Sequence, residues 1–166
     1  MNIRIAAAAA AMLAAGAPAR AEDPVALPIM RLHMNMALTA AETALQECRA
    51  QGLNVAVTVV DRGGHPQVTL RDTLAMPITV PVSQQKAFAA LNFNSPTSQL
   101  EGRFTSPFSP GKLEGLILSA GGLPIAAAST ILGGIGVSGA PSGEVDEACA
   151  QAGLDAIQTD LEMGLM

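Results

Sequence analysis

Apolar residues recur at three- and four-residue intervals between residues 29 and 51, which is the spacing of an amphipathic helix. Gly52 follows the last periodic position and Pro28 precedes the first, so the pattern predicts a helix from Ile29 to Gln51. Its apolar face carries Leu32, Met36, Ala40, Ala44 and Cys48. His33 follows Ile29 by four positions and precedes Met36 by three, so we expect it on the same inward face.

The next segment has the pattern of a β-hairpin. Asn54–Asp61 is rich in β-branched residues and predicts a strand, and Arg62–His65 is a glycine-containing turn. Pro66–Arg71 predicts the returning strand, because proline is tolerated at a strand start or on an edge. Asp61, at the end of the first strand, is expected to cap the turn.

The second half of the chain predicts two longer helices, a short helix and three strands. A helix is expected from Ser83, as its N-cap, to about Asn94, and a last helix from Ser142 or Gly143 to near Gly164. A short helix is expected after Ser95, and the strands are Leu116–Ser119, Ile125–Ala128 and Ile131–Ser138. This order predicts an α/β (α+β) domain with a central five-stranded antiparallel sheet flanked by helices on both faces.

The run Gly134–Gly139 matches the G-x-G-x-x-G pattern of dinucleotide-binding turns. That pattern binds a pyrophosphate only within a strand-turn-helix-strand unit, and only about 27 residues follow Gly139. One helix fits into that length, but a returning strand does not. We therefore expect these glycines in a strand that another backbone or a ligand approaches closely.

The first 21 residues have the pattern of a secretory signal peptide. Arg4 gives a positive start, Ile5–Ala17 is an apolar stretch too short to span a bilayer, and Ala19–Ala21 is a small-x-small cleavage site. A retained anchor is the alternative. Cleavage predicts a periplasmic or secreted protein whose single domain is residues 22–166.

Charge and cysteine content narrow the function classes. Without Arg4 and Arg20 the chain keeps seven basic against 14 acidic residues, a balance that argues against binding nucleic acid. Cys48 and Cys149 lie on the apolar faces of the first and last predicted helices. They either form a disulfide, which an exported protein can keep, or are two buried small hydrophobic residues. Neither belongs to a C-x-x-C pair, which excludes a zinc knuckle and covalent heme attachment.

Several of these segments together resemble the GlcG/HbpS-like heme-binding family, which also contains the C-terminal domain of the PduO corrinoid adenosyltransferase. The segments are Val57–His65, Arg71-Asp72, Lys86–Ala90, Gly121–Ile125 and Gly134–Gly139, followed by Asp146-Glu147. The resemblance covers about residues 31–162. It implies an antiparallel sheet with helices on both faces, and self-association into homo-oligomers. Some members bind heme, whereas others accompany glycolate or diol utilisation.

The resemblance implies that some residues of this chain could be ligands of heme iron. His33 is the first candidate axial ligand, because imidazole is the commonest ligand of non-covalent heme and some relatives use a histidine near the start of the first helix. The alternative is a core histidine bonded to a carbonyl. His65 is the second candidate axial ligand. The alternative is that His65 is a solvated residue of the turn. Thioethers that could ligate opposite a histidine are those of Met30, Met34, Met36 and Met76.

Arg71 and Lys86 are the expected partners of carboxylates, either heme propionates or a small organic acid. A snorkelling surface lysine is the alternative for Lys86. No nucleophile motif is present, and Asp146-Glu147 fits the first turn of a helix better than acid–base catalysis. The sequence thus favours an exported heme-binding protein without established catalysis. An enzyme or binding protein for a small organic acid is the alternative.

Overall fold

The computed structural model describes residues 24–165, so the predicted signal peptide lies outside the described residues. The longer elements are α1 (Met34–Ala50), β1 (Ala56–Asp61), β2 (Pro66–Arg71), α2 (Thr79–Phe93), β3 (Gly122–Ala127), β4 (Thr130–Ser138) and α3 (Gly143–Gly164). Two short 3₁₀ helices, Thr97–Gln99 and Pro110–Lys112, lie between α2 and β3. Among the described residues, no helix has the length and hydropathy needed to cross a membrane.

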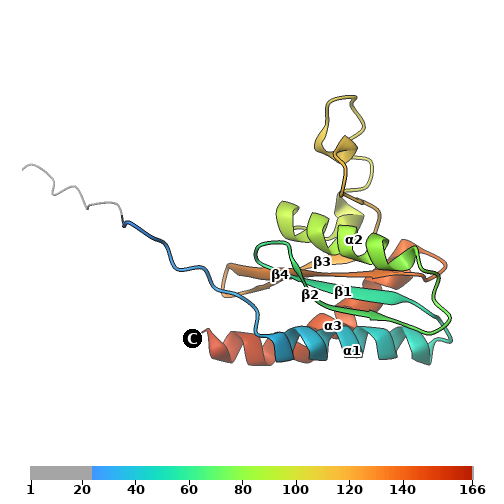
Figure 1. Ribbon diagram of the computed structural model, residues 1–166, viewed down its shortest axis with the longest axis horizontal. Helices are drawn as coiled ribbons and strands as arrows, with labels where there is room; N and C mark the ends of the chain where they lie inside the picture. The colour runs from blue at the N-terminus through green and yellow to red at the C-terminus, as the bar shows by residue number, and fades with distance from the viewer. Residues whose placement is uncertain (1–23, 166) are drawn as a thin grey trace, which may run out of the picture.

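The sheet is antiparallel and has four strands in the order β2-β1-β4-β3. The prediction of a fifth strand at Leu116–Ser119 was wrong, because this segment has no regular structure. It belongs to the connection between α2 and β3, which projects from the sheet on the α2 side (Figure 1). Within that projection Leu118 packs close to Gly111, so the apolar run is used inside the connection rather than in the sheet.

Helices cover both faces of the sheet, as predicted. Figure 1 shows α1 and α3 side by side on one face and α2 on the other. The core between the sheet and the α1–α3 layer is built from Val57, Val59, Ile135 and Val137 of the strands and from small helix residues such as Ala40 and Ala44. Small residues let the helices approach closely, so the α1–α3 layer packs tightly.

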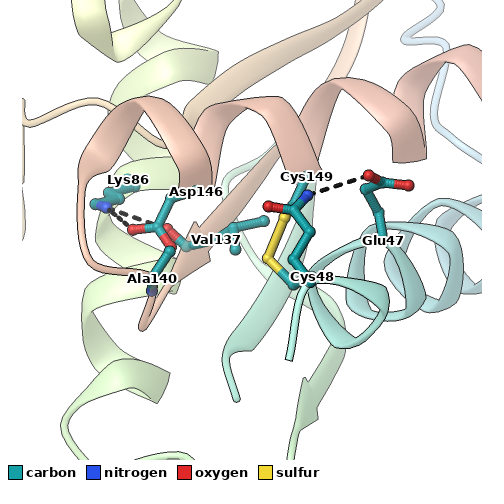
Figure 2. The surroundings of a disulfide bond; sticks show 8 residues. Glu47, Cys48, Lys86, Val137, Ala140, Asp146 and Cys149 are labelled. Atoms are coloured by element: carbon teal, nitrogen blue, oxygen red, sulfur yellow. Dashed lines mark hydrogen bonds and ion pairs between the residues drawn. A yellow bond between two sulfur atoms is a disulfide. The ribbon is translucent and has the colours of Figure 1, made fainter. Parts of the chain in front are cut away.

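A disulfide joins α1 to α3. Cys48 and Cys149 have their Cα atoms 5.7 Å apart, and both residues are completely buried (Figure 2). Of the two alternatives left open by the sequence, the structure has the disulfide. It closes a loop with a sequence separation of 101 residues, so it links the first and last elements of the fold.

Gly134 and Gly136 of β4 face α2. A Cβ atom at Gly134 would collide with the carbonyl oxygen of Ala87, and one at Gly136 with that of Ser83. The expectation of a close backbone approach is therefore confirmed, with helix α2 as the approaching backbone. The G-x-G-x-x-G pattern is explained by packing alone.

Two helix boundaries differ from the prediction. α1 begins at Met34, because the preceding residues form an extended segment. α2 begins at Thr79, with Pro81 in its first turn, where proline is tolerated. Ser83 is therefore inside α2 rather than its N-cap, and its hydroxyl lies 2.8 Å from Oγ1 of Thr58 on β1. The last helix begins after its N-cap Ser142, as expected.

Candidate functional site

One end of the domain brings together segments that are far apart in the sequence. The N-terminal arm, defined here as residues 24–33, starts away from the domain, and its residues 28–33 lie beside the N-terminus of α1, the β1–β2 and β3–β4 turns and the C-terminal end of α3 (Figure 1). Two side-chain contacts hold the arm in place. Arg31 lies 3.2 Å from a carboxylate oxygen of Asp61, and Gln67 Nε2 donates a hydrogen bond of 3.0 Å to the carbonyl of Leu32.

A cleft lies between the arm and the end of α3. We call it the arm cleft. It has a volume of about 200 Å³, and His33 lies on its wall. Its apolar wall consists of Met30, Leu32, Met36, Leu132, Leu161 and Leu165. Two hollows adjoin the arm cleft. The hollow of about 440 Å³ shares Met30 with the cleft, and the hollow of about 270 Å³ shares Arg31 with it. Ile29 lines both hollows. Arg62 lines both hollows, so the apolar cleft opens toward cationic side chains.

Asp61 anchors the arm to the β1–β2 turn. One of its carboxylate oxygens accepts hydrogen bonds from the backbone N–H groups of Gly63 and His65, at 2.8 and 3.0 Å, so the expected turn cap is confirmed. Burial opposes ionisation of this carboxyl, but the two N–H groups and the charge of Arg31 outweigh it and hold the pKa of Asp61 below its usual value. The carboxylate therefore stays charged and keeps Arg31 at the cleft.

The lowered pKa predicts a loss of stability in acid. A group whose pKa is lower in the folded state contributes stability above its unfolded pKa of about 3.9, and this stability is lost as pH falls through the folded value. Urea unfolding measured between pH 6 and pH 3 should show a decline below about pH 4 that is smaller in Asp61→Asn. An equal decline in the variant would show that Asp61 contributes nothing to it. The hydrogen bond from Arg49 also lowers the pKa of Asp72. Asp72 is unchanged in the variant, so both proteins should share the part of the stability loss that Asp72 causes.

His33 lies at the cleft but not on the inward helix face. The prediction of an inward-facing residue within the helix was wrong, because the helix begins after His33, which is exposed and serves as the N-cap. Its Nδ1 accepts a hydrogen bond of 3.3 Å from the Asn35 backbone N–H. In a neutral imidazole that accepts at Nδ1, the proton is on Nε2. In this state His33 is a helix cap whose Nε2 is a donor.

His65 is oriented by Asp61. Its Nδ1 lies 3.5 Å from the Asp61 carboxylate, and its side chain is 79% exposed. A carboxylate facing Nδ1 favours a proton there and leaves Nε2 free as a ligand atom. His65 thus has the tautomer of a metal ligand, whereas His33 lies on the wall of the arm cleft.

The methionines divide between two regions. Met30 and Met36 line the arm cleft beside His33, and Met34 is exposed on the first turn of α1. Met76 is exposed in the connection between β2 and α2. Only the first group is placed to bind a ligand together with His33.

Arg71 and Lys86 lie at the opposite end of the domain. Arg71 on β2 pairs with Ala56 at the start of β1, whereas Asp61 and the arm lie at the end of β1. The guanidinium of Arg71 donates a hydrogen bond to the carbonyl of Ala75. Lys86 Nζ bonds the carbonyl of Val137, which also lies near the start of β1. The structure therefore does not bring Arg71 or Lys86 together with His33.

Lys86 forms a buried ion pair with Asp146. Its Nζ lies 2.9 Å from Asp146 Oδ2, each side chain is only 5% exposed, and the other carboxylate oxygen accepts from the Ala140 N–H at 2.9 Å (Figure 2). The interpretation of Lys86 as a snorkelling surface residue was wrong. The pair joins α2 to α3 inside the domain, where it can stabilise the fold.

Sequence reasoning missed Arg31 and Arg62 as candidate residues. Arg31 is at the cleft because an ion pair with a residue thirty positions away holds it there, which no local pattern reveals. From the sequence, Arg62 is expected only to form part of a turn. Within residues 24–165, no group of three or more His, Cys, Asp or Glu side chains could hold a metal ion by itself.

Together these features define a small α+β domain with an apolar cleft at one end, edged by Arg31, His33 and Asp160. The chain belongs to the HbpS-like family: a family model described as "Haem degrading protein HbpS-like" matches residues 32–155. A crystal structure of a double mutant of HbpS from Streptomyces reticuli is 37% identical, with a TM-score of 0.77 over 86% of this chain and 98% of that chain.

More distant structures share the fold. Protein ORFY of Klebsiella pneumoniae is 23% identical, with a TM-score of 0.77 over 82% of this chain and 97% of that chain. A PduOC:heme complex is also 23% identical, with a TM-score of 0.69 over 77% of this chain and 96% of that chain. A search of curated protein sequences found no match.

Proposed function

We propose that this protein is an exported heme-binding protein that holds heme non-covalently in the arm cleft. Membership of the HbpS-like family and the heme complex of a structural relative support heme as the ligand. The observation that carries the proposal is the meeting of His33, Arg31 and the thioethers of Met30 and Met36 around one apolar cleft, with Arg62 lining the hollows beside it. Transport, buffering or sensing of heme in the periplasm or outside the cell would suit such a protein.

The side chains at the cleft fit the chemistry of heme. Its apolar wall suits a macrocycle, and imidazole and thioether groups are the usual axial ligands. Arg31 and Arg62 are placed for the propionates, because guanidinium groups pair well with carboxylates. The adjoining hollow of about 440 Å³ has a size found in small-molecule sites. When bound, heme would supply a redox-active iron.

The residues of the cleft have separable tasks. His33 would hold the iron and Arg31 a propionate, and Asp61 would keep Arg31 in position through their 3.2 Å contact. Closure of the arm over the ligand would bury Met30, which is half exposed in this structure. His65 is the alternative ligand, since Asp61 leaves its Nε2 free.

A hemin titration tests this proposal. The chain, exported to the periplasm of a bacterial host and purified without heme, should give a saturable shift of the Soret band. Replacing His33 by Ala should weaken hemin binding at least tenfold and change the spectrum, because a ligand to iron is lost. Met76→Leu, remote from the cleft, is the matched control and should bind as the wild type does. Unchanged hemin binding by His33→Ala would show that His33 is not the iron ligand. In that case His65→Ala should be the variant with weakened hemin binding.

A small organic acid is the second candidate ligand. The hollow of about 270 Å³ lined by Arg31 and Arg62 could hold a carboxylate without heme. Thermal stabilisation by glycolate, but not by hemin, would favour this function.

We also propose that the protein self-associates. Leu74, Met76 and Ile78 are exposed together in the connection between β2 and α2, although such side chains are usually covered. Light scattering that gave the mass of a single chain would refute this proposal.

A further inference from the structure

Gln67 occupies an irregular position beside the arm. Val59 pairs with Val68 and Val60 pairs with Pro66, so Gln67 is an extra residue with no partner opposite it on β1. Such a β-bulge redirects a side chain and is common next to functional sites. Here the amide is directed toward the arm, where its Nε2 donates to the carbonyl of Leu32, the residue before His33.

The other end of the same amide is unsatisfied. Gln67 Oε1 is buried and has no hydrogen-bond partner within the described part of the chain. A buried acceptor without a donor destabilises the folded state, because it loses its hydrogen bonds to water without replacement. Exchanging the two amide atoms does not help, because an oxygen would then face the Leu32 carbonyl. The arm region therefore contains an acceptor that the protein itself does not use.

Iron binding by His33 requires an acceptor of this kind. To offer Nε2 to a metal, His33 must carry its proton on Nδ1, and it must then give up the long hydrogen bond from the Asn35 N–H. Histidine ligands almost always donate their second ring N–H to an oxygen atom. Gln67 Oε1 is a buried acceptor without a donor, and the amide that carries it is bonded to Leu32, the residue directly before His33.

We infer that Gln67 Oε1 accepts the Nδ1–H of His33 when this residue binds heme iron, so that Gln67 is the positioning residue of the ligand. This inference rests on the proposed function. Heme binding would then exchange one hydrogen bond for another. His33 would lose the bond from the Asn35 N–H that caps α1, and Gln67 Oε1 would gain a donor. Gln67 Nε2 continues to hold the arm through Leu32.

Three substitutions separate the two ends of the amide. Gln67→Met removes donor and acceptor, Gln67→Lys keeps a donor for Leu32 but cannot accept, and Gln67→Glu keeps an acceptor but cannot donate. Hemin affinity and the iron–imidazole stretching frequency of the ferrous protein are measured for each. Thr73→Lys and Thr73→Glu, at an exposed position just after β2 and remote from the arm, control for added charge.

We expect the Met and Lys variants to bind hemin about 10- to 100-fold more weakly, the usual cost of losing a partner of a metal ligand. Their stretching frequency should fall, because Nδ1–H no longer donates. The Glu variant should keep a frequency at or above that of the wild type. Met should change the thermal stability of the heme-free protein little, since the removal of the unsatisfied acceptor offsets the lost hydrogen bond to Leu32.

The opposite ordering would overturn the inference. If the tether to Leu32 were the only role of Gln67, the Lys variant would resemble the wild type and the Glu variant would resemble Met. Unchanged spectra in all three variants would also overturn it while leaving heme binding intact. Failure of the wild type to bind hemin would overturn the proposed function and this inference together.

Discussion

Replacing both Cys48 and Cys149 by Ala should lower the free energy of unfolding by about 4.7 kcal/mol, the value for a closed loop of about 100 residues. The disulfide links residues that are 101 positions apart in the sequence. Its loss therefore raises the conformational entropy of the unfolded chain and favours unfolding. Both cysteines are completely buried, and alanine also leaves a small cavity between α1 and α3.

Urea unfolding of the exported protein, with and without a reductant, measures this loss. The double variant should unfold at the same urea concentration in both conditions, whereas the wild type should become less stable once it is reduced. A difference between variant and wild type below about 1 kcal/mol would contradict the assigned role, because it lies well under the loop-closure value.

Replacing Lys86 by Met should lower the free energy of unfolding by about 3–5 kcal/mol, because it leaves the buried carboxylate of Asp146 without its partner. The two side chains are 2.9 Å apart and each is only 5% exposed, so water compensates little for the lost charge. At about 2–4 °C per kcal/mol, the melting temperature should fall by roughly 10 °C.

The double variant Lys86→Met/Asp146→Leu provides the internal control. Replacing a buried ion pair by apolar residues of similar size is often nearly neutral, so the double variant should be more stable than Lys86→Met alone. Equal losses in the two variants would show that packing around Lys86, rather than its charge, explains the effect. Hemin binding should be unchanged in both, since Lys86 is remote from the arm cleft.

Much of the fold could be predicted from local patterns. The β1–β2 hairpin, the last helix and the close approach at Gly134 and Gly136 follow from β-branched runs, capping residues and glycine spacing. The cysteines could be placed on facing helices because their positions follow the apolar periodicity. Only the structure could decide between a disulfide and two thiols.

The errors concern positions where tertiary contacts decide. Leu116–Ser119 has the composition of a strand, but most of it lies half-buried within the projection, and it pairs with no strand of the sheet. His33 fits the helical period, but the helix begins one residue later, and a side chain at the N-cap does not follow the inward stripe. Lys86 was expected near a ligand because its helix is nearly uncharged, and its partner lies 60 residues away.

The candidate site was predicted only in part. His33 and His65 do lie at the same end of the domain as the arm, but the cations beside them are Arg31 and Arg62. The orphaned oxygen of Gln67 depends on a one-residue irregularity in the pairing of β1 and β2, which the alternation of residues does not reveal.

The most direct test of the account is to map where a heme analogue binds. Gallium protoporphyrin IX, a diamagnetic analogue, is added to isotope-labelled protein, and the backbone amide shifts are followed by NMR. Heme binding in the arm cleft predicts changes concentrated in residues 28–36, 61–67, 129–132 and 160–165. Changes centred instead on Gln84, Gln85 and Phe88, which line a separate hollow on α2, or no changes at all, would contradict it.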